Sequence, residues 1–395
     1  MPTMLQRDRA MRGLELEITR RYWSYDALGF ADADERADLS RRVAEESSGR
    51  NELMWISDGA ATPLYFPSIY VRFGAKVCPI PDAAVATDKV HPAFKVSSNV
   101  VKDLLIGKYQ GKVRSSNSKN LFLSLRGVDP TVSITIDNFV AYARNNGNNH
   151  HIITNAEWAY IQQLCKAQGY QPHGNTYFGH DSSYPSEIGE AAMCEGNTPY
   201  YIGRVLTGSG PLTWSHDGSP YGIWDLNGNV WEWCVGFRLK SGVMQIIANN
   251  DAAANSTDLS SASAAWKSIL GDGTLVDDGT SGELKYVLAT ADYGVSVPPS
   301  GGLFNGVAQT YQTTTDSVVS QVAVPAILKE LGIVPHDAGD YGGDGFWYDL
   351  TGERVCWRGG PWYYGTQSGV FALVLSNTHS YAYYSVGSRP AFYRA

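Results

Sequence analysis

The segment from Tyr221 to Trp233 constrains the fold of this chain more than any other part of the sequence. It reads YGIWDLNGNVWEW, which is a tight Asn-Gly turn followed by a strand. Alternation along that strand places Trp231 and Trp233 on one face and Val230 and Glu232 on the other. A carboxylate between two indoles is not expected to lie free in solvent. Glu232 therefore either accepts backbone N–H bonds or ligates a hard cation.

Two further motifs accompany this strand. Residues Thr154–Glu157 read TNAE, a capping box in which the hydroxyl and the carboxylate satisfy each other's backbone N–H groups. Trp158 and Ile161 follow at helical spacing, so a helix is predicted to begin here. Closer to the C-terminus, residues Arg358–Trp362 read RGGPW.

In these three motifs the chain resembles the formylglycine-generating-enzyme (sulfatase-modifying-factor) family, over about residues 60–395 apart from an insertion. The resemblance implies an α+β, C-type lectin fold of the formylglycine-generating-enzyme type. Such a fold has small twisted antiparallel sheets, two flanking helices and much irregular loop. The resemblance also implies a structural calcium ion, held by Asn227, Glu232 and the backbone of Gly228 and Val230. A Glu232 satisfied by N–H groups would do the same structural job, and no other cofactor is expected.

The sequence departs from the family at the residues that carry out the family's reactions. Members that oxidise a substrate cysteine bind copper through a pair of cysteines after the R-G-G motif, and no cysteine follows Arg358 in this sequence. Cys356 precedes the motif, and we expect no partner near it. The histidine set of the related iron-dependent sulfoxide synthases is also missing. We therefore expect a protein that is not an enzyme, with a formylglycine-generating-enzyme-like oxidase of altered chemistry as the alternative.

The thirty residues from Gly359 to Ser388 contain no Asp, Glu, Lys or Arg, where the chain's 18% charged fraction would give about five. Charge depletion with aromatic enrichment indicates either a buried sheet or the core of a binding surface. Residues Val370–Ser376 alternate as a half-buried strand does. The tyrosines on either side of this strand fall in glycine-flanked segments. Tyrosine offers large, rigid contact area with a hydroxyl, as in evolved binding surfaces.

Residues 358–391 also resemble, more closely, the variable region of proteins diversified by diversity-generating retroelements. The glycine, aromatic and apolar positions of that region recur here, and the departures fall mainly where its template has asparagine. Mutagenesis at adenines converts an Asn codon into Tyr, Ser, Pro, Val, Thr or His codons, and the substitutions here obey that chemistry. The resemblance implies that the variable, ligand-binding residues are Pro361, Tyr363, Tyr364, Thr366, Val374, Ser376, Asn377, His379, Tyr381, Tyr383, Tyr384 and Ser385.

The composition divides the chain into unequal parts. Residues 1–50 hold 19 of the 70 charged side chains and predict a charged helical N-terminal element, with a second helix over 32–46. Residues 51–395 predict the C-type-lectin-like domain. Within it, the Ala-, Ser-, Thr-, Gly- and Asp-rich stretch 240–345 is interpreted as an insertion, and the Asp/Gly stretch 337–349 as a polar turn.

The net charge of −8 and the absence of a Lys/Arg cluster exclude a surface built for nucleic acid or anionic lipid. No apolar run approaches the roughly 20 residues of a membrane-spanning helix, and no signal peptide is visible. Together these features predict a massively variable ligand- or receptor-binding protein that displays changeable side chains on a rigid scaffold. Its ligand would be a protein or glycan on a cell surface. We expect it on a phage virion tail or a bacterial cell surface, with oligomerisation or virion attachment through the N-terminal element.

Overall fold

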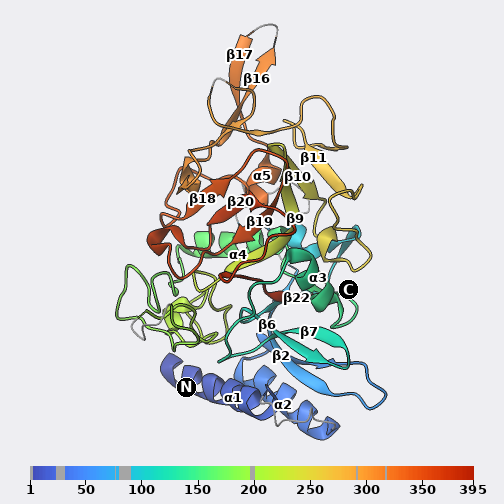
Figure 1. Cartoon of the computed structure of the whole chain (residues 1–395), viewed down its shortest axis with the longest axis vertical. Helices are drawn as coiled ribbons and strands as arrows, with labels where there is room; N and C mark the ends of the chain where they lie inside the picture. Colours follow the sequence, from blue (N-terminus) through green and yellow to red (C-terminus); the bar gives the residue numbers. More distant parts are fainter. Residues whose placement is uncertain are drawn as a thin grey trace.

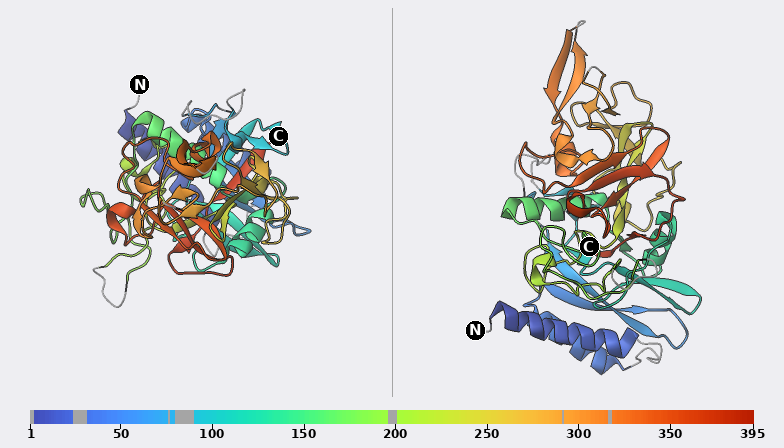
Figure 2. Two further views of the ribbon diagram at one scale, coloured as in Figure 1. Left: turned by 90° about the horizontal axis from the view of Figure 1, so that it is seen from above. Right: turned by 60° about the vertical axis from the view of Figure 1, so that its left-hand side comes forward.

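A computed structural model of the chain describes residues 3–23, 32–75, 77–79, 90–195, 201–290, 292–315 and 318–395. Figure 1 places two N-terminal helices at one end of the molecule and a projecting hairpin, β16 (Thr310–Thr315) and β17 (Val318–Ala323), at the other, with the sheets between them. Figure 2 shows the same order from the side. The α-helices of the described residues are α1 (Met4–Trp23), α2 (Ala33–Glu46), α3 (Ile136–Arg144), α4 (Asn155–Gln168) and α5 (Ala326–Glu330).

A five-stranded sheet lies next to the N-terminal helices. Its order is β1 (Asn51–Ser57), β2 (Tyr65–Gly74), β5 (Asp103–Gly107), β22 (Pro390–Arg394) and β8 (His150–Ile152). The C-terminal strand β22 is an inner strand, with Ala391 opposite Ile106 on one side and His151 on the other. The end of the chain is therefore held between strands from its first half.

A nine-stranded sheet forms the centre of the molecule and carries the tryptophan-rich motif. In it, β9 and β19 pair antiparallel, with Trp233 opposite Trp357 and Glu232 opposite Arg358. The strand predicted after the Asn-Gly turn is thus confirmed as β9. The order is β12 (Leu275–Val276), β11 (Trp266–Ile269), β10 (Val243–Ile247), β9 (Trp231–Lys240), β19 (Glu353–Arg358), β20 (Leu373–Asn377), β18 (Gly345–Tyr348) and β15 (Gly302–Leu303), with β21 (Val386–Gly387) paired to β9.

The stretch interpreted as an insertion contributes to both the central sheet and the projecting end. Residues 240–345 supply β10, β11, β12 and β15 as well as helix α5, and the limits of the insertion stay a prediction. The polar turn expected over 337–349 holds for residues 337–344 and is wrong for 345–348, because strand β18 lies there and pairs in parallel with β20. The remaining strands are β3 (Lys95–Val96), β4 (Asn99–Val100), β6 (Gly111–Ser116), β7 (Lys119–Ser124), β13 (Tyr286–Val287) and β14 (Val295–Ser296).

Helix α4 begins where the capping box predicts. The Thr154 hydroxyl accepts the Glu157 N–H at 3.1 Å, and the Glu157 carboxylate accepts the Thr154 N–H at 2.9 Å. The helix ends at Gly169, whose left-handed φ of +63° suits a residue without a Cβ. The mainly antiparallel sheets, helices α3 and α4 and the long irregular loops confirm the α+β fold class. None of the described helices is both long and apolar enough to cross a membrane.

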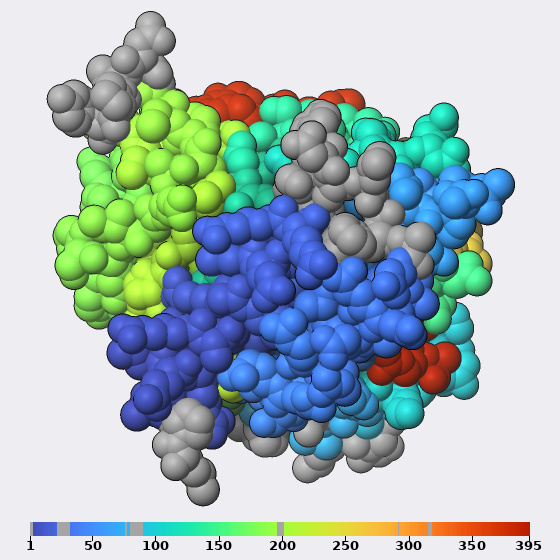
Figure 3. All heavy atoms as spheres, turned by 90° about the horizontal axis from the view of Figure 1, so that it is seen from below, coloured from blue at the N-terminus to red at the C-terminus, as the bar shows by residue number. Residues whose placement is uncertain are grey.

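Helices α1 and α2 form a layer that packs on strands β1 and β2 of the five-stranded sheet. Figure 3 views the molecule from below and shows the two helices in the middle of that face of the molecule. The predicted second helix is α2, which is capped by the Asp32 carboxylate. The layer packs through apolar side chains of both helices and of strands β1 and β2, namely Leu14, Ile18, Leu39, Val43, Leu53 and Ile69.

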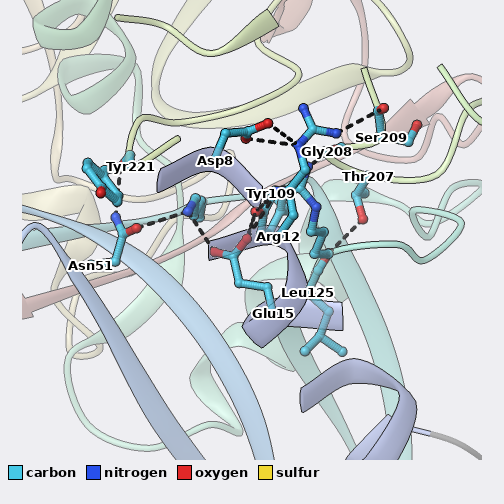
Figure 4. Close-up of polar contacts among 12 residues, drawn as sticks. Asp8, Arg12, Glu15, Asn51, Tyr109, Leu125, Thr207, Gly208, Ser209 and Tyr221 are labelled. Atoms are coloured by element: carbon cyan, nitrogen blue, oxygen red, sulfur yellow. Dashed lines mark hydrogen bonds and ion pairs between the residues drawn. The ribbon is translucent and has the colours of Figure 1, made fainter. Parts of the chain in front are cut away.

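A buried carboxylate fixes α1 to the domain. Glu15 is fully buried and lies 2.6 Å from the Lys108 ammonium and 3.1 Å from the Arg126 guanidinium, and it accepts the Tyr109 hydroxyl at 2.6 Å (Figure 4). Burial alone would raise the pKa of Glu15, but the two cations lower it, so the group is ionised. The helix position is therefore specified by charge as well as by apolar contact.

Replacing Glu15 is expected to destabilise the protein strongly. The Glu15→Ala variant leaves Lys108 and Arg126 buried without their counter-charge, which costs about 3–5 kcal/mol of unfolding free energy. Glu17→Ala is the matched control, because Glu17 lies on the same helix in an exposed ion pair with Arg42 and should change stability by less than about 0.5 kcal/mol. Urea titration of both variants measures the difference. Equal, small losses would show that α1 is not held by this cluster.

Candidate ligand-binding site

Residues 358–391 cross the central sheet and end in the five-stranded one. The segment leaves the end of β19, returns as β20, continues as β21 beside β9, and enters β22. Val386 and Gly387 pair with Trp231 and Glu232 of the tryptophan motif. The two sequence features identified separately, the motif and the charge-free stretch, are thus neighbours in the fold.

Buried arginines fix both ends of this segment. Arg358 donates to the side chain of Asn155 at 2.7 Å and to the carbonyl of Gly332 at 2.9 Å. Arg389 forms an ion pair with Glu232, at 2.7 and 3.0 Å to its two oxygens. All three charged side chains are fully buried. A guanidinium in such a position holds its neighbours in one geometry, because each lost partner would leave a buried polar group unsatisfied.

The positions that match the constant part of the retroelement pattern form the core. The Trp158 indole of α4 donates to the carbonyl of Val370 at 2.7 Å, and the Asp344 carboxylate accepts the N–H of Phe371 at 2.7 Å. A Cβ on Gly360 would lie 2.4 Å from the Ser368 side chain, so only glycine fits there. The side chains buried in this way are Trp362, Val370, Phe371, Ala372, Leu373, Leu375 and Val386.

The predicted variable residues are mostly at the surface. Four tyrosines are between 37% and 41% exposed, namely Tyr364, Tyr381, Tyr383 and Tyr384. Thr366 is also exposed, and Tyr363, Ser376, Asn377 and His379 are half-buried. Pro361, Val374 and Ser385 are buried. The large aromatic members of the set are therefore the ones that solvent reaches.

Eight of these twelve residues line one cavity of about 230 Å³. They are Tyr363, Tyr364, Val374, Ser376, Asn377, Tyr381, Tyr383 and Ser385. The lining is completed by three tryptophans from different strands of the central sheet, Trp231, Trp347 and Trp357. No side chain in this lining carries a charge. We refer to this feature as the tyrosine cavity.

The rings of the tyrosine cavity contact one another. Tyr364 packs on Trp347 with centroids 5.1 Å apart and meets Trp231 edge to face at 5.9 Å. Tyr381 packs on Trp357 at 5.4 Å and lies 5.9 Å from Tyr383. Such offset and edge-to-face contacts hold rings in place at little entropic cost. The walls are consequently ordered before any ligand arrives.

The phenols of Tyr363, Tyr364, Tyr381 and Tyr384 are neutral at physiological pH, because burial raises the pKa of each. Burial raises the pKa of Tyr364 and Tyr381, and it raises the pKa of Tyr384 to about 12. Tyr363, whose pKa is also raised by burial, shares a 3.0 Å hydrogen bond with the Ser385 hydroxyl. The cavity therefore offers ring faces and neutral hydroxyl and amide groups.

The other four predicted residues lie outside the cavity lining. Tyr384 contacts the cavity lining through Tyr383, and the centroids of these two rings lie 4.5 Å apart. Thr366 lines a different cavity of about 310 Å³ beside Asp344, and Pro361 is buried in the frame. His379 lies 2.8 Å from the Asp137 carboxylate of α3 and 3.8 Å from that of Glu353. Burial would lower the pKa of His379, but the bond to Asp137 raises it.

The residues expected to hold calcium do not fit that ion. The side-chain amide of Gln110 lies where a cation would, within 3.0–3.4 Å of the carbonyls of Asp225, Gly228 and Val230 and of the Glu232 carboxylate. Both Glu232 oxygens also accept from Arg389. Asn227, the fourth expected ligand, donates its amide to the carbonyl of Pro172. The side chains of Gln110 and Arg389 thus satisfy the carboxylate, in place of the backbone N–H groups or the cation that the sequence left open.

Cys356 does have a neighbour, contrary to expectation. Cys234 lies directly opposite it on β9, and both thiols are free and fully buried. Burial would raise the pKa of Cys356, but Cys234 and Arg358 lower it, whereas burial and Cys356 raise the pKa of Cys234. The pair was missed because the two residues are far apart in sequence. Only the register of β9 with β19 brings them together.

Gln110 and Trp347 are site residues that the sequence did not reveal. Trp347 falls in the stretch interpreted as a polar turn, although the run of three aromatic residues Phe346, Trp347 and Tyr348 was a signal for a strand there. For Gln110, a single amide in an unremarkable segment, the sequence carries no signal.

Comparison with known proteins supports the family resemblance for part of the chain. Residues 95–265 match the family model of the sulfatase-modifying factor enzyme 1-like domain. No curated protein matches the sequence. Among solved structures, Treponema denticola variable protein 1 is similar over 87% of this chain and 98% of its own length, at 10% identity and a TM-score of 0.32. The P3c and U1 variants of Major Tropism Determinant are similar over 87% of this chain and 72% of theirs, at 9% identity and TM-scores of 0.28.

Asp344, which holds the backbone before β20, predicts a pH dependence of stability. Burial raises the pKa of Asp344 to about 8, so between pH 5 and 8 the folded state binds a proton that the unfolded state has released. Its contribution to unfolding free energy therefore falls as pH rises through this window. Asp344→Asn removes the titration, and the stability of this variant relative to wild type is expected to increase from pH 5 to pH 8 in urea titrations.

Asp349→Asn is the control for this measurement. Asp349 is near the surface, and its hydrogen bond with Thr351 lowers its pKa, so its contribution to stability is constant between pH 5 and 8. A pH-independent difference between wild type and Asp344→Asn would show that Asp344 is ionised in the folded protein.

Proposed function

We propose that this chain is a non-enzymatic, massively variable binding protein whose contact residues are diversified by a retroelement. The observation that carries the proposal is the partition of residues 358–391. Most positions that match the constant pattern are buried, with Gly365, Ser380 and Ala382 as the exceptions, whereas eight of the twelve positions expected to vary line one uncharged cavity. Side chains that face solvent on a fixed frame can change with little effect on folding.

The proposed ligand is a protein or a glycan on a cell surface. The cavity walls are ordered, aromatic and uncharged. Such a surface suits binding in which a few aromatic side chains of the protein supply most of the affinity. We propose a place on a phage tail or a bacterial cell surface, where several copies would raise weak single-site binding to useful avidity. The helices α1 and α2, which lie at one end of the molecule, would mediate assembly or attachment. The name of Major Tropism Determinant, a similar structure, agrees with receptor selection.

The oxidase alternative lacks an accessible pair of thiols in the described part of the chain, where Cys194 is the exposed cysteine. The one thiol pair found in the described residues, Cys234 and Cys356, lies inside the central sheet with no exposed surface. A substrate thiol could reach neither sulfur without separating β9 from β19. The geometry thus favours binding over catalysis.

Removing the exposed tyrosines is expected to abolish binding without unfolding the protein. The triple variant Tyr381→Ala, Tyr383→Ala, Tyr384→Ala loses exposed rings, so each change should cost less than about 1 kcal/mol of stability. Capture of bacterial cells that the wild-type chain binds should be lost. Phe371→Ala is the opposite control, since deletion of this fully buried ring is expected to cost about 3–5 kcal/mol. A large stability loss in the triple variant would show that the tyrosines are core.

The DNA beside the gene tests the retroelement origin. We expect a near-copy of the sequence that encodes residues 358–391, with adenines at the variable codons, and a reverse-transcriptase gene nearby. Sibling genes should differ at the twelve variable positions and agree at the other positions of residues 358–391. Siblings that differ mainly elsewhere would contradict the proposal.

A further inference from the structure

The projecting end of the molecule is poor in charge and rich in exposed apolar side chains. Between residues 293 and 328 the sequence contains one charged residue, Asp316, where the chain's 18% charged fraction would give about six. Exposed apolar surface without charge is typical of a contact with another macromolecule. The exposed large hydrophobic residues of this end are Leu288, Tyr293, Leu303, Val318, Val319 and Val322.

Strand β17 is the outer edge of this end. The four-stranded sheet has the order β13, β14, β16, β17, so β17 pairs with β16 on one side and with no described strand on the other (Figure 1). All its side chains are exposed, and its three valines are 40% to 63% exposed. Edge strands of natural proteins usually carry a Lys, a Pro or a bulge that prevents pairing with another strand. Residues Val318–Ala323 contain neither Lys nor Pro, and their register with β16 is uninterrupted.

The open edge of β17 presents backbone groups at alternate residues. The Val324 N–H donates to the Gln309 carbonyl at 2.9 Å, so this pair directs its backbone groups across the ladder. In an antiparallel ladder the direction alternates from residue to residue, and Val319, Gln321 and Ala323 therefore direct their N–H and C=O groups away from β16. These groups have no hydrogen-bond partner within the described part of the chain. The edge is thus a template for one more strand.

The chemistry of this edge selects its occupant. A membrane would leave the outward N–H and C=O groups unsatisfied, and no Lys or Arg lies between residues 293 and 328 to meet lipid headgroups. A charged peptide would find no counter-charge along Val318–Ala323. An uncharged strand with β-branched and small side chains fits, and β17 is itself such a strand. Because each copy has a net charge of −8, an uncharged surface is also where two copies repel each other least.

We infer that β17 pairs antiparallel with β17 of a second copy of this chain, about a twofold axis at Gln321. The outward-facing residues then exchange backbone hydrogen bonds, with Gln321 opposite its own counterpart and Val319 opposite Ala323 of the other copy. On the other face of the strand, Ser320 lies beside Val322 of the other copy. The two sheets become one continuous sheet, and the contact closes with two copies because it is the same on both.

This contact does not depend on the proposed binding function, but it would add to it. The hairpin lies at the opposite end of the molecule from α1 and α2, so the dimer leaves both helices uncovered (Figure 2). Each dimer would carry two tyrosine cavities, which raises avidity for a surface with many receptors. A single short strand buries less area than a standard interface, so we expect weak association, with a Kd on the order of 10–100 µM.

Sedimentation velocity of the full chain, at about 1–300 µM to span this Kd, measures the association. The wild-type chain is expected to convert from monomer to dimer. Gln321→Lys places two ammonium groups directly opposite each other and should weaken dimerisation about fivefold or more, and Gln321→Glu should do the same with two carboxylates. An equimolar mixture of the two variants pairs Lys with Glu and should dimerise at least as well as wild type. Recovery in the mixture also shows that both variants are folded.

Val100→Lys is the control, because it adds the same charge to an exposed residue of β4 in the two-stranded sheet β3–β4. It should dimerise as the wild-type chain does. A wild-type chain that stays monomeric, a dimer that persists in Gln321→Lys, or a mixture that stays monomeric would each overturn the inference. A monomeric wild-type chain that sediments with phosphatidylcholine vesicles would replace the second copy by a membrane.

Discussion

The buried ion pair between Glu232 and Arg389 is the interaction on which the rest of the structure depends. It joins β9 of the central sheet to the residue that precedes β22 of the five-stranded sheet. Arg389 also donates to the carbonyls of Gly107 and Trp224, each at 2.9 Å. Burying two charges gives little net stability, but no other arrangement of these strands would satisfy them. The pair therefore fixes how the two sheets meet, and with that the path of the segment between them.

This arrangement separates folding from recognition within one short stretch of chain. Arg358 and Arg389 bond the two ends to distant elements, and Phe371 and its neighbours fill the core between them. What remains at the surface are side chains whose loss removes little buried area. Changes at the exposed side chains should therefore alter contacts with little effect on folding, whereas changes at the buried Pro361, Val374 and Ser385 should cost stability.

Local patterns in the sequence were enough for the elements that local interactions determine. The capping box predicted the start of α4, and alternation predicted β9 and the apolar residues of β20. Gln110 in place of calcium, Cys234 opposite Cys356 and Trp347 in the cavity could not be predicted, since each depends on contacts between segments that are far apart in the sequence. The resemblance to the variable region found the tyrosines, but only the fold shows that Pro361 lies within the frame.

The contacts among the aromatic rings of the tyrosine cavity reduce the conformational entropy that would be lost when a ligand binds. A tyrosine that is free to rotate loses conformational entropy on binding, which subtracts from affinity. Here Tyr364 is already packed on Trp347, and Tyr381 on Trp357, so part of that loss has occurred on folding. The partners that order them are indoles from strands β18 and β19, which precede residues 359–391 in the sequence. A different aromatic side chain introduced at either position would meet the same indole. These indoles thus hold the rings of the tyrosine cavity in place.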